Sequence, residues 1–336
     1  MLTVLRSLNQ ALHQLMNEDA RVMVLGEDIL DPYGGAFKVT KGLSDAHPAR
    51  VLTTPISEAA IVGLASGMAL RGLRPIAEIM FGDFLFLAGD QLVNHAAKFQ
   101  WMYNDQVRVP IVVRAPMGAR RGYGPTHSQS IEKHFMGVPG LWVVAPSVLA
   151  VPGDLLRQAA MMDAPVVFIE SKTCYGRELV SGVAGMTKTT VVDRESPFPT
   201  VLLKHDDVQA DALLWCYGAM VPHALDAVAA LKDREGLHVD LAVISQLSPI
   251  AASHIAQVLD ASHPAVVAYV EEASVEHGWS AELLSRVDAA VARRGLGPVT
   301  HVRIGAAHTP IPSSRALEAA MLPGADDIVA RIVDCF

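Results

Sequence analysis

The sequence predicts an α/β fold in two successive domains, a first one built on a parallel sheet and a second, smaller one. Apolar, β-branched runs recur between stretches of helical periodicity, which is typical of parallel strands covered by helices on both faces. The length of 336 residues favours two domains over one. A polar segment with two prolines, over 187–200, interrupts the alternation as a linker does.

We therefore predict a first domain over 1–186, a linker over 187–200 and a second domain over 201–336. The chain begins with an amphipathic helix whose apolar stripe is formed by Leu2, Leu5, Leu8, Leu12 and Leu15. The predicted strands of the first domain lie at 21–28, 74–81, 109–116, 141–147 and 164–171. In the second domain, strands are predicted at 210–218, 238–245, 265–272 and 300–305, and helices at 222–231 and 280–294.

Composition limits the class of protein. Hydrophobic residues make up 51% of the chain and charged residues 18%, with a mean hydropathy of +0.30, so we expect an obligate oligomer with part of its surface covered. A net charge of −8 without a basic run argues against a nucleic-acid partner. No apolar run reaches the roughly 18 residues of a membrane span. Three widely spaced cysteines and the absence of a signal-peptide pattern at the start predict a cytoplasmic protein.

Several common motifs are absent from the sequence. It contains no G-x-G-x-x-G after a strand and no G-x-x-x-x-G-K-[ST], which disfavours dinucleotide and P-loop phosphate binding. It contains neither a G-x-S-x-G elbow nor H-E-x-x-H. By itself the chain is therefore neither an ordinary dehydrogenase nor an ordinary hydrolase.

The segment TTPISEAAIVGLASGMAL, residues 53–70, has one acid, Glu58. Ser57 is a candidate N-cap, and an acid in the first turn is stabilised by the helix dipole, which is the simplest interpretation of Glu58. However, the following residues leave the helix no polar face, so we expect it to be buried on all sides with Glu58 at its mouth. Burial favours the protonated carboxyl group more than the dipole opposes it, which suits Glu58 to share a proton with a buried ring nitrogen.

Longer segments carry a family resemblance. The runs VLGEDILDPYGGAFKVTKGL, RVLTTPISEAAIVGLASGMALRGLRPIAEIMFGDF and RGYGPTHSQSIEKHFMGVPGLWVVAPS resemble the beta subunit of the thiamine-diphosphate-dependent first component of 2-oxo acid dehydrogenase complexes, of the pyruvate, acetoin and branched-chain type. Further on, EEASVEHGWSAELLSRV and VRIGAAHTPIPSSRALEAAMLP resemble the transketolase C-terminal domain. The resemblance covers most of the chain and implies a thiamine pyrimidine-binding domain followed by a transketolase C-terminal-type domain.

The resemblance implies roles for five residues. In the family, the residue matching Glu58 hydrogen-bonds N1′ of the cofactor's aminopyrimidine and promotes its imino tautomer. Ile56, Met80 and Phe84 match positions that line the pyrimidine pocket, and Phe84 matches its stacking aromatic residue; the alternative is that these three only pack in the core. His127, in the loop GYGPTHSQS, matches a histidine that faces the substrate and the acyl intermediate.

Metal sites are implied in two ways. Some members of the family hold a potassium ion, mainly through backbone carbonyls, at the positions of Ile111, Ala160, Met161 and Asp163, although the segment MMDAPVV is shorter than in some relatives. The G-D-G…N-N signature for magnesium and diphosphate is absent from this chain. The resemblance therefore implies that an alpha subunit holds most of the magnesium diphosphate, with the cofactor at the interface of an α2β2 tetramer.

The resemblance implies oxidative decarboxylation of a small 2-oxo acid, pyruvate-like, or cleavage of acetoin, with transfer of the acyl group to the lipoyl groups of an acyltransferase component. An alternative keeps thiamine diphosphate and changes the reaction, to a two-chain transketolase-like or carboligating enzyme. A third hypothesis, a scaffold subunit with a degenerate site, is disfavoured because Glu58, Phe84 and His127 are all present.

Overall fold

The structure, a computed structural model, describes residues 2–194 and 196–336. Its contacts divide the chain into two compact units that interleave along the sequence. The first unit comprises the chain through Gly118, Gln129–Pro146 and Val151–Leu179. The second comprises Ala119–Ser128, Ser147–Ala150 and Val180–Phe336. Residues 180–186, predicted as part of the first domain, thus belong to the second unit.

The first unit contains a parallel sheet with strand order β5-β6-β4-β3-β1-β2. These strands are β1 (Val22–Gly26), β2 (Val51–Thr53), β3 (Arg74–Glu78), β4 (Val112–Met117), β5 (Trp142–Val144) and β6 (Val166–Ser171). The central strand β4 is buried along its whole length, which is why its sequence does not alternate between apolar and polar residues. The predicted parallel sheet is confirmed; the short strand β2 was not predicted.

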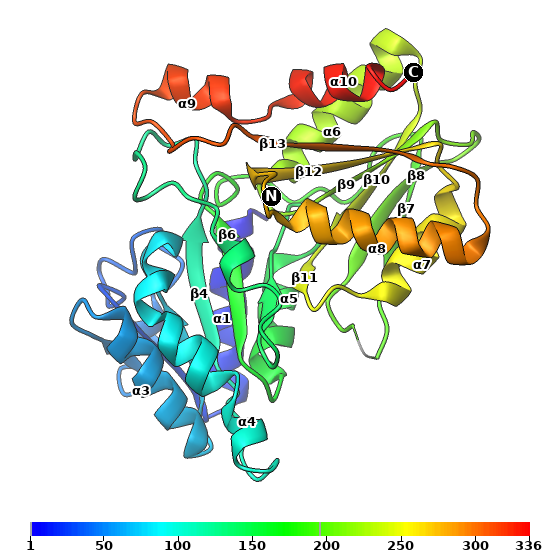
Figure 1. Ribbon diagram of the computed structural model, residues 1–336. Coiled ribbons are helices and arrows are strands. Elements are labelled where there is room, and N and C mark those ends of the chain that lie inside the picture. The colour runs from blue at the N-terminus through cyan, green and yellow to red at the C-terminus, as the bar shows by residue number, and fades with distance from the viewer. Residues whose placement is uncertain (1, 195) are drawn as a thin grey trace. The chain divides into compact units, whose positions relative to one another are not determined.

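Helices cover both faces of this sheet (Figure 1). On one face, α1 (Val4–Glu18) packs on α5 (Pro152–Met161), where Gly153 comes so close to Ser7 that a Cβ there would lie 2.5 Å from the Ser7 carbonyl oxygen. On the other face lie α3 (Glu58–Leu70), the 3₁₀ helix η1 (Gly82–Ala88) and the π-helix η2 (Gln91–Ala96). The remaining short helices are α2 (Leu43–Ala46), α4 (Phe99–Met102) and the 3₁₀ helix η3 (Glu132–His134).

Helix α3 departs from the prediction of burial on all sides. Its inner side, which includes Ile61 and Val62, is buried, but Leu64 is 50% exposed and Leu70 40% exposed. Both sides of the helix are apolar, so the sequence pattern could not distinguish the buried side from the exposed one. Within this chain, α3 leaves an apolar side uncovered.

The second unit contains a mixed six-stranded sheet with strand order β13-β12-β9-β10-β8-β7. The strands are β7 (Met186–Val191), β8 (Thr200–His205), β9 (Ala212–Cys216), β10 (Val239–Ile244), β12 (Val266–Ser274) and β13 (Thr300–Ala306). β9, β10, β12 and β13 run parallel, whereas β8 pairs antiparallel with β10 and with β7. Helices α6 (Met220–Ala230) and α10 (Ala325–Val333) pack on one face, and α7 (Ala252–Ser262) and α8 (Trp279–Arg294) on the other (Figure 1).

Strand β7 begins at Met186 and occupies 187–191 of the segment 187–200, for which the sequence predicted a linker. Thr187, Thr189 and Thr190 are β-branched, and only the two ends of the strand are buried. Such a polar strand is stable at the edge of a sheet, where one side faces water. The second unit is completed by η4 (Leu231–Glu235), β11 (Gln246–Ser248) and α9 (Arg315–Met321). Among the described residues, no helix has the length and apolar character needed to cross a membrane.

Candidate active site

Three glutamates lie where the parallel strands β1, β2 and β3 end. Glu27 directly follows β1, Glu78 is the last residue of β3, and Glu58 begins α3, the helix that follows β2. Each of the three is only 5% exposed. In open parallel sheets, ligands bind outside the carboxyl ends of the strands, so this edge is the candidate site of the first unit.

Glu58 is buried, as the sequence predicted. Its backbone lies in the first turn of α3, where unpaired N–H groups place a partial positive charge. Ser57 occupies the N-cap position, but its side chain makes no capping hydrogen bond, so the prediction of a serine cap is wrong in this detail. Other partners are therefore needed for the N–H groups at this end of the helix.

Glu27 was not predicted as a site residue. Burial, together with the negative charges of Glu58, Asp28 and Glu78, raises the pKa of Glu27 to about 7. Its Oε1 atom is buried and has no hydrogen-bond partner among the described residues. A carboxyl group with this pKa exchanges its proton near neutral pH. The signal in the sequence was an acid directly after a buried strand, in VLGED.

A buried ion cluster lies beside these acids. The Nη1 atom of Arg114, on β4, is 2.7 Å from Oε2 of Glu78, and its Nε and Nη2 atoms donate to the two carboxylate oxygens of Glu170, at 2.7 and 2.8 Å. The Tyr175 hydroxyl donates to Glu170 at 2.6 Å. Burial raises the pKa of Glu78, while the Arg114 charge opposes that rise. The guanidinium group thus joins the carboxyl ends of β3, β4 and β6 with bidentate geometry.

The three residues predicted to line a pyrimidine pocket lie on neighbouring segments of this edge. Ile56 precedes α3 and is 82% exposed, so core packing, the alternative interpretation, is wrong for this residue. Met80 follows β3 and Phe84 lies in η1, and both side chains are half-buried. The Phe84 ring contacts the Phe81 ring edge to face, with 6.1 Å between the centroids.

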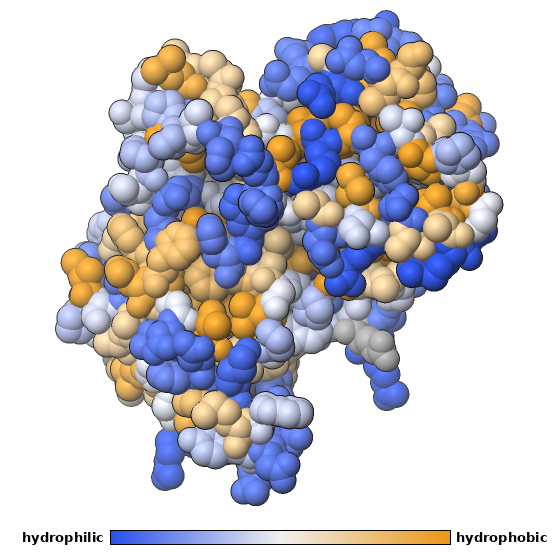
Figure 2. Space-filling view, viewed as in Figure 1, coloured by the Kyte–Doolittle hydropathy of each residue, from blue (hydrophilic) through white to orange (hydrophobic). Residues whose placement is uncertain are grey.

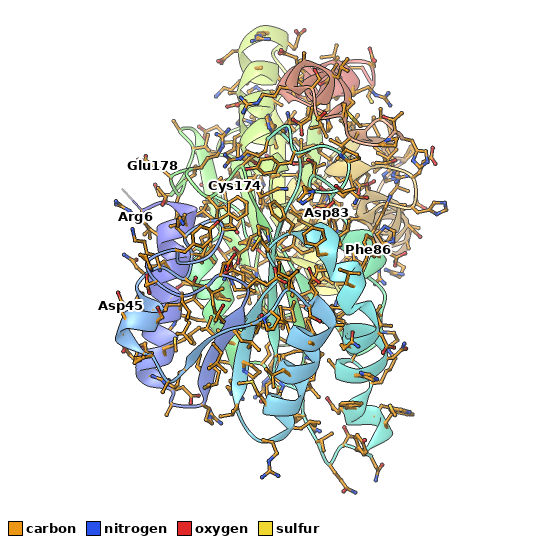
Figure 3. The ribbon with its side chains drawn as sticks, turned by 90° about the vertical axis from the view of Figure 1, so that its left-hand side faces the viewer. Arg6, Asp45, Asp83, Phe86, Cys174 and Glu178 are labelled. Atoms are coloured by element: carbon orange, nitrogen blue, oxygen red, sulfur yellow. The ribbon has the colours of Figure 1, made fainter. Side chains whose placement is uncertain are left out.

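Helix η1, which carries Phe84, is fixed at its start. Oδ1 of Asp83 accepts hydrogen bonds from the backbone N–H and the side-chain amide of Gln129, at 3.2 and 2.8 Å. Gly82 packs so closely on Met117, at the end of β4, that a Cβ at this position would lie 2.6 Å from the Met117 side chain. Figure 3 shows Asp83 and Phe86 on this segment. The start of η1, two residues before Phe84, is therefore held by Met117 and Gln129.

His127 lies in the second unit, in the loop Ala119–Ser128. Its side chain is half-buried, and Nδ1 is 3.0 Å from the Thr126 hydroxyl oxygen. The backbone N–H of His127 donates to the Gly124 carbonyl, which closes a tight turn. The Thr126 hydroxyl is thus one contact within the loop that orients the imidazole.

The residues predicted to hold potassium include oxygens that already have a cationic partner. Nη1 of Arg74 donates to the carbonyl oxygens of Ala160 and Met162, at 3.0 and 2.9 Å, and Nη2 lies 2.6 Å from Oδ1 of Asp163. The Ile111 carbonyl accepts from Val166 of the sheet, and Met161 is 52% exposed. The guanidinium group thus supplies positive charge at the oxygens of Ala160 and Asp163, and the potassium site stays a prediction.

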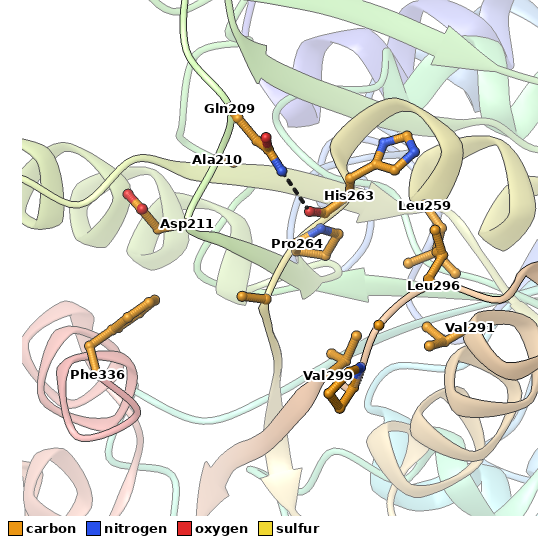
Figure 4. A pocket seen from close by; sticks show the side chains of 13 residues that line it. Gln209, Ala210, Asp211, Leu259, His263, Pro264, Val291, Leu296, Val299 and Phe336 are labelled. Carbon is orange, nitrogen blue, oxygen red and sulfur yellow. Dashed lines mark hydrogen bonds between the residues drawn. The ribbon is translucent and has the colours of Figure 1, made fainter.

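The second unit has a pocket of about 540 Å³ at the amino ends of its parallel strands (Figure 4). Asp211, Ala265 and Val299, which line it, immediately precede β9, β12 and β13. Nε2 of Gln209 donates to the carbonyl of His263 across the pocket, at 3.2 Å. The pocket therefore lies at the amino ends of the strands, whereas ligands of open parallel sheets bind at the carboxyl ends. We assign it no catalytic role.

Family models match this chain in two contiguous segments. The transketolase pyrimidine-binding domain matches residues 1–177, and the transketolase C-terminal domain matches residues 202–328. The acetoin:2,6-dichlorophenolindophenol oxidoreductase subunit beta of Cupriavidus necator is 35% identical, over 98% of this chain and 96% of that protein. The pyruvate dehydrogenase E1 component subunit beta-2, mitochondrial, of Oryza sativa is also 35% identical, over 98% and 84%.

One further relative and one solved structure are also similar to this chain. The 3-methyl-2-oxobutanoate dehydrogenase subunit beta of Mycobacterium tuberculosis is 34% identical, over 99% of this chain and 90% of that protein. A solved structure described as a split gene transketolase, inactive beta4 tetramer, superposes with a TM-score of 0.74, over 99% of this chain and 98% of that one. At 21% sequence identity, the latter comparison shows the fold alone.

Proposed function

We propose, since this chain belongs to the family of beta subunits of thiamine-dependent 2-oxo acid dehydrogenase first components, that it is the beta subunit of an enzyme that oxidatively decarboxylates a small 2-oxo acid. The acyl group would pass to the lipoyl groups of an acyltransferase component. The observation that supports this function is the pair of buried carboxyl groups, Glu58 and Glu27, at the carboxyl edge of a parallel sheet.

The residues at this edge fit thiamine diphosphate. Glu58 would hold a proton against a pyrimidine ring nitrogen, and Met80, Phe84 and Ile56 would line the ring. Bound thiamine diphosphate would supply the electron sink for decarboxylation. Among the described residues, Glu27 has a buried oxygen without a partner, and its pKa of about 7 suits it to exchange a proton near neutral pH. In the second unit, His127 would orient the 2-oxo acid.

An alpha subunit would complete the enzyme, in an α2β2 tetramer. The beta-subunit names of the relatives support such a partner, which would hold most of the magnesium and diphosphate. The surface supports it too, because the first unit exposes large apolar side chains that include Ile56, Leu64 and Trp101, which is 86% exposed. On the face of the molecule that Figure 2 draws, hydrophobic side chains lie among the polar ones. A second chain would remove such side chains from water.

The experiment is calorimetric titration of thiamine diphosphate, with magnesium present, into this chain alone and into its mixture with the candidate alpha subunit. We expect tight binding only in the mixture. Tight binding by this chain alone would overturn the two-chain site. The assembled enzyme is then assayed with pyruvate, branched-chain 2-oxo acids and acetoin. Acyl transfer to a lipoyl domain supports the dehydrogenase, whereas transfer only to an aldehyde would show the carboligating alternative.

A further inference from the structure

The loop Ala119–Ser128, which carries His127, has an unusual backbone. Arg120, Gly122 and Gly124 all have positive φ angles, of 68°, 71° and 78°. Glycine adopts this conformation freely, but for an arginine it costs free energy. Such a conformation persists only where surrounding contacts hold it.

Glu318, on helix α9 of the same unit, supplies those contacts. Its Oε1 atom accepts a hydrogen bond from the backbone N–H of Arg120, at 2.7 Å, and its Oε2 atom accepts one from the N–H of Gly122, at 3.0 Å. The side chain is 1% exposed, so water does not compete for the carboxylate. Hydrogen bonds to an ionised acceptor are roughly twice as strong as neutral ones.

Further contacts fasten the start of the loop to the second unit. The N–H of Ala119 donates to Oε1 of Glu272, on β12, at 2.5 Å, and Nη2 of Arg120 donates to the carbonyl of Pro323 at 2.6 Å. Ala119 also packs in an apolar cluster with Ala306 and Leu322. The second half of the loop has contacts too: a Cβ at Gly124 would lie 3.5 Å from the Ser313 side chain, and Ser128 is fully buried. Glu318 and Glu272 therefore fix the first half of the loop, through which the backbone leads to His127.

We propose that Glu318 is a positioning residue for His127: by accepting both N–H groups it fixes the loop that orients the imidazole. This inference rests on the proposed function, in which His127 faces the substrate. It assigns to a carboxylate far along the sequence, and without any catalytic motif of its own, a role in substrate binding.

The test uses the assembled enzyme with Glu318→Gln. A glutamine oxygen can accept one of the two hydrogen bonds, but its NH₂ group would face the second N–H donor. We expect deuterium exchange of the 119–128 backbone to accelerate about tenfold and KM for the 2-oxo acid to rise about tenfold, since a charge-assisted hydrogen bond is lost. The Kd of thiamine diphosphate should stay unchanged.

The matched control is Asp240→Asn in the same unit. Asp240 is also fully buried, and its carboxylate accepts from the N–H of His205 and the hydroxyl of Ser262, neither of which touches the loop. It should destabilise the unit without changing loop exchange or KM. If Glu318→Gln folds poorly, Arg120→Met removes the Pro323 contact while keeping the cost of the positive φ angle, and a smaller change in the same direction is expected.

Unchanged exchange over 119–128 in both loop variants would overturn the positioning role. His127→Asn separates this failure from failure of the proposed function. If His127→Asn turns over normally, the assigned role of His127 is wrong, and with it the positioning role, even where Glu318→Gln loosens the loop. If His127→Asn raises KM and Glu318→Gln reproduces that increase, the inference stands.

Discussion

Buried acids have different partners in the two units of the molecule. In the second unit, Glu271 on β12 accepts from the backbone N–H groups of Trp279 and Ser280 at the start of α8, and Glu318 accepts two N–H groups of the His127 loop. In the first unit, Glu27 has a buried oxygen without a partner in the described part of the chain, and Glu58 lies close enough to raise its pKa. Acids paired with backbone donors fix structure, whereas an acid left beside other acids can exchange a proton.

The largest expected effect is that of Glu58→Gln on turnover. The amide is nearly isosteric but cannot share a proton with a ring nitrogen, so turnover of the assembled enzyme should fall by about 10²–10⁴-fold. Steady-state decarboxylation measures this, with thiamine diphosphate binding as the control. Turnover at the wild-type rate would contradict the distinction between reactive and structural acids.

Arg114→Met tests what holds the reactive edge together. The substitution leaves Glu78 and Glu170 buried without their cation, and unfolding free energy should fall by about 3–5 kcal/mol, as measured by urea denaturation. Glu271→Gln in the second unit should cost less, about 1–3 kcal/mol, because the amide oxygen still accepts some of the hydrogen bonds from Trp279 and Ser280, and the ion pair with Arg303 that is lost is long, at 3.9 Å. Arg286→Ala, which removes an exposed pair with Glu282, is the surface control and should change little. Equal losses for Arg114→Met and Glu271→Gln would mean that the buried acids of the two units do not differ in this respect.

Comparison of the wild type with Glu27→Gln tests how the titration of Glu27 makes the stability of the fold depend on pH. The folded-state pKa of Glu27 is raised from 4.5 to about 7, so its contribution to stability is fully present below about pH 4.5 and is lost as pH rises through 7. Between pH 5 and pH 8, the wild-type chain should therefore lose about 1–2 kcal/mol relative to Glu27→Gln, after a discount for screening by solvent. Urea denaturation of both proteins across this range measures the difference. A difference that does not change with pH would show that Glu27 is ionised throughout.

The smallest expected effect is that of Arg74, whose guanidinium group contacts residues at the end of α5. Arg74→Met removes three hydrogen bonds and should lower the unfolding free energy by about 1–2 kcal/mol. Comparing the wild-type melting temperature in potassium chloride and in sodium chloride tests the predicted potassium site at the same oxygens. A higher melting temperature in potassium alone would support that site, and equal values would contradict it.

The sequence predicted the parts of the structure that leave a periodic or local pattern. Continuous apolar runs such as the one containing Val112 identify parallel strands, and an acid before an apolar helix identified Glu58. It did not identify Glu27 or the partners of Arg114, because the pairing of residues from different strands depends on strand order. Strand β7 was taken for a linker because its threonines are polar, although β-branched residues suit an edge strand.

The candidate site was likewise predictable only where its residues belong to a local sequence motif. Ile56, Met80 and Phe84 come from three consecutive segments, so a family motif could assign them. Glu318 could not be found this way, because nearly two hundred residues separate it from the backbone that it holds. The exposed side of α3 was missed for another reason: an apolar pattern predicts burial without saying which molecule buries it.

Interleaving of the two units limits how the protein can be recombined. A cut at the end of the predicted first domain would separate Ala119–Ser128 from Glu272 and Glu318, and the loop would lose its shape. Chimeras that exchange C-terminal halves between relatives must therefore transplant this loop together with α9. In this chain, the segments that must be exchanged together are those that contact one another, although they are not contiguous in the sequence.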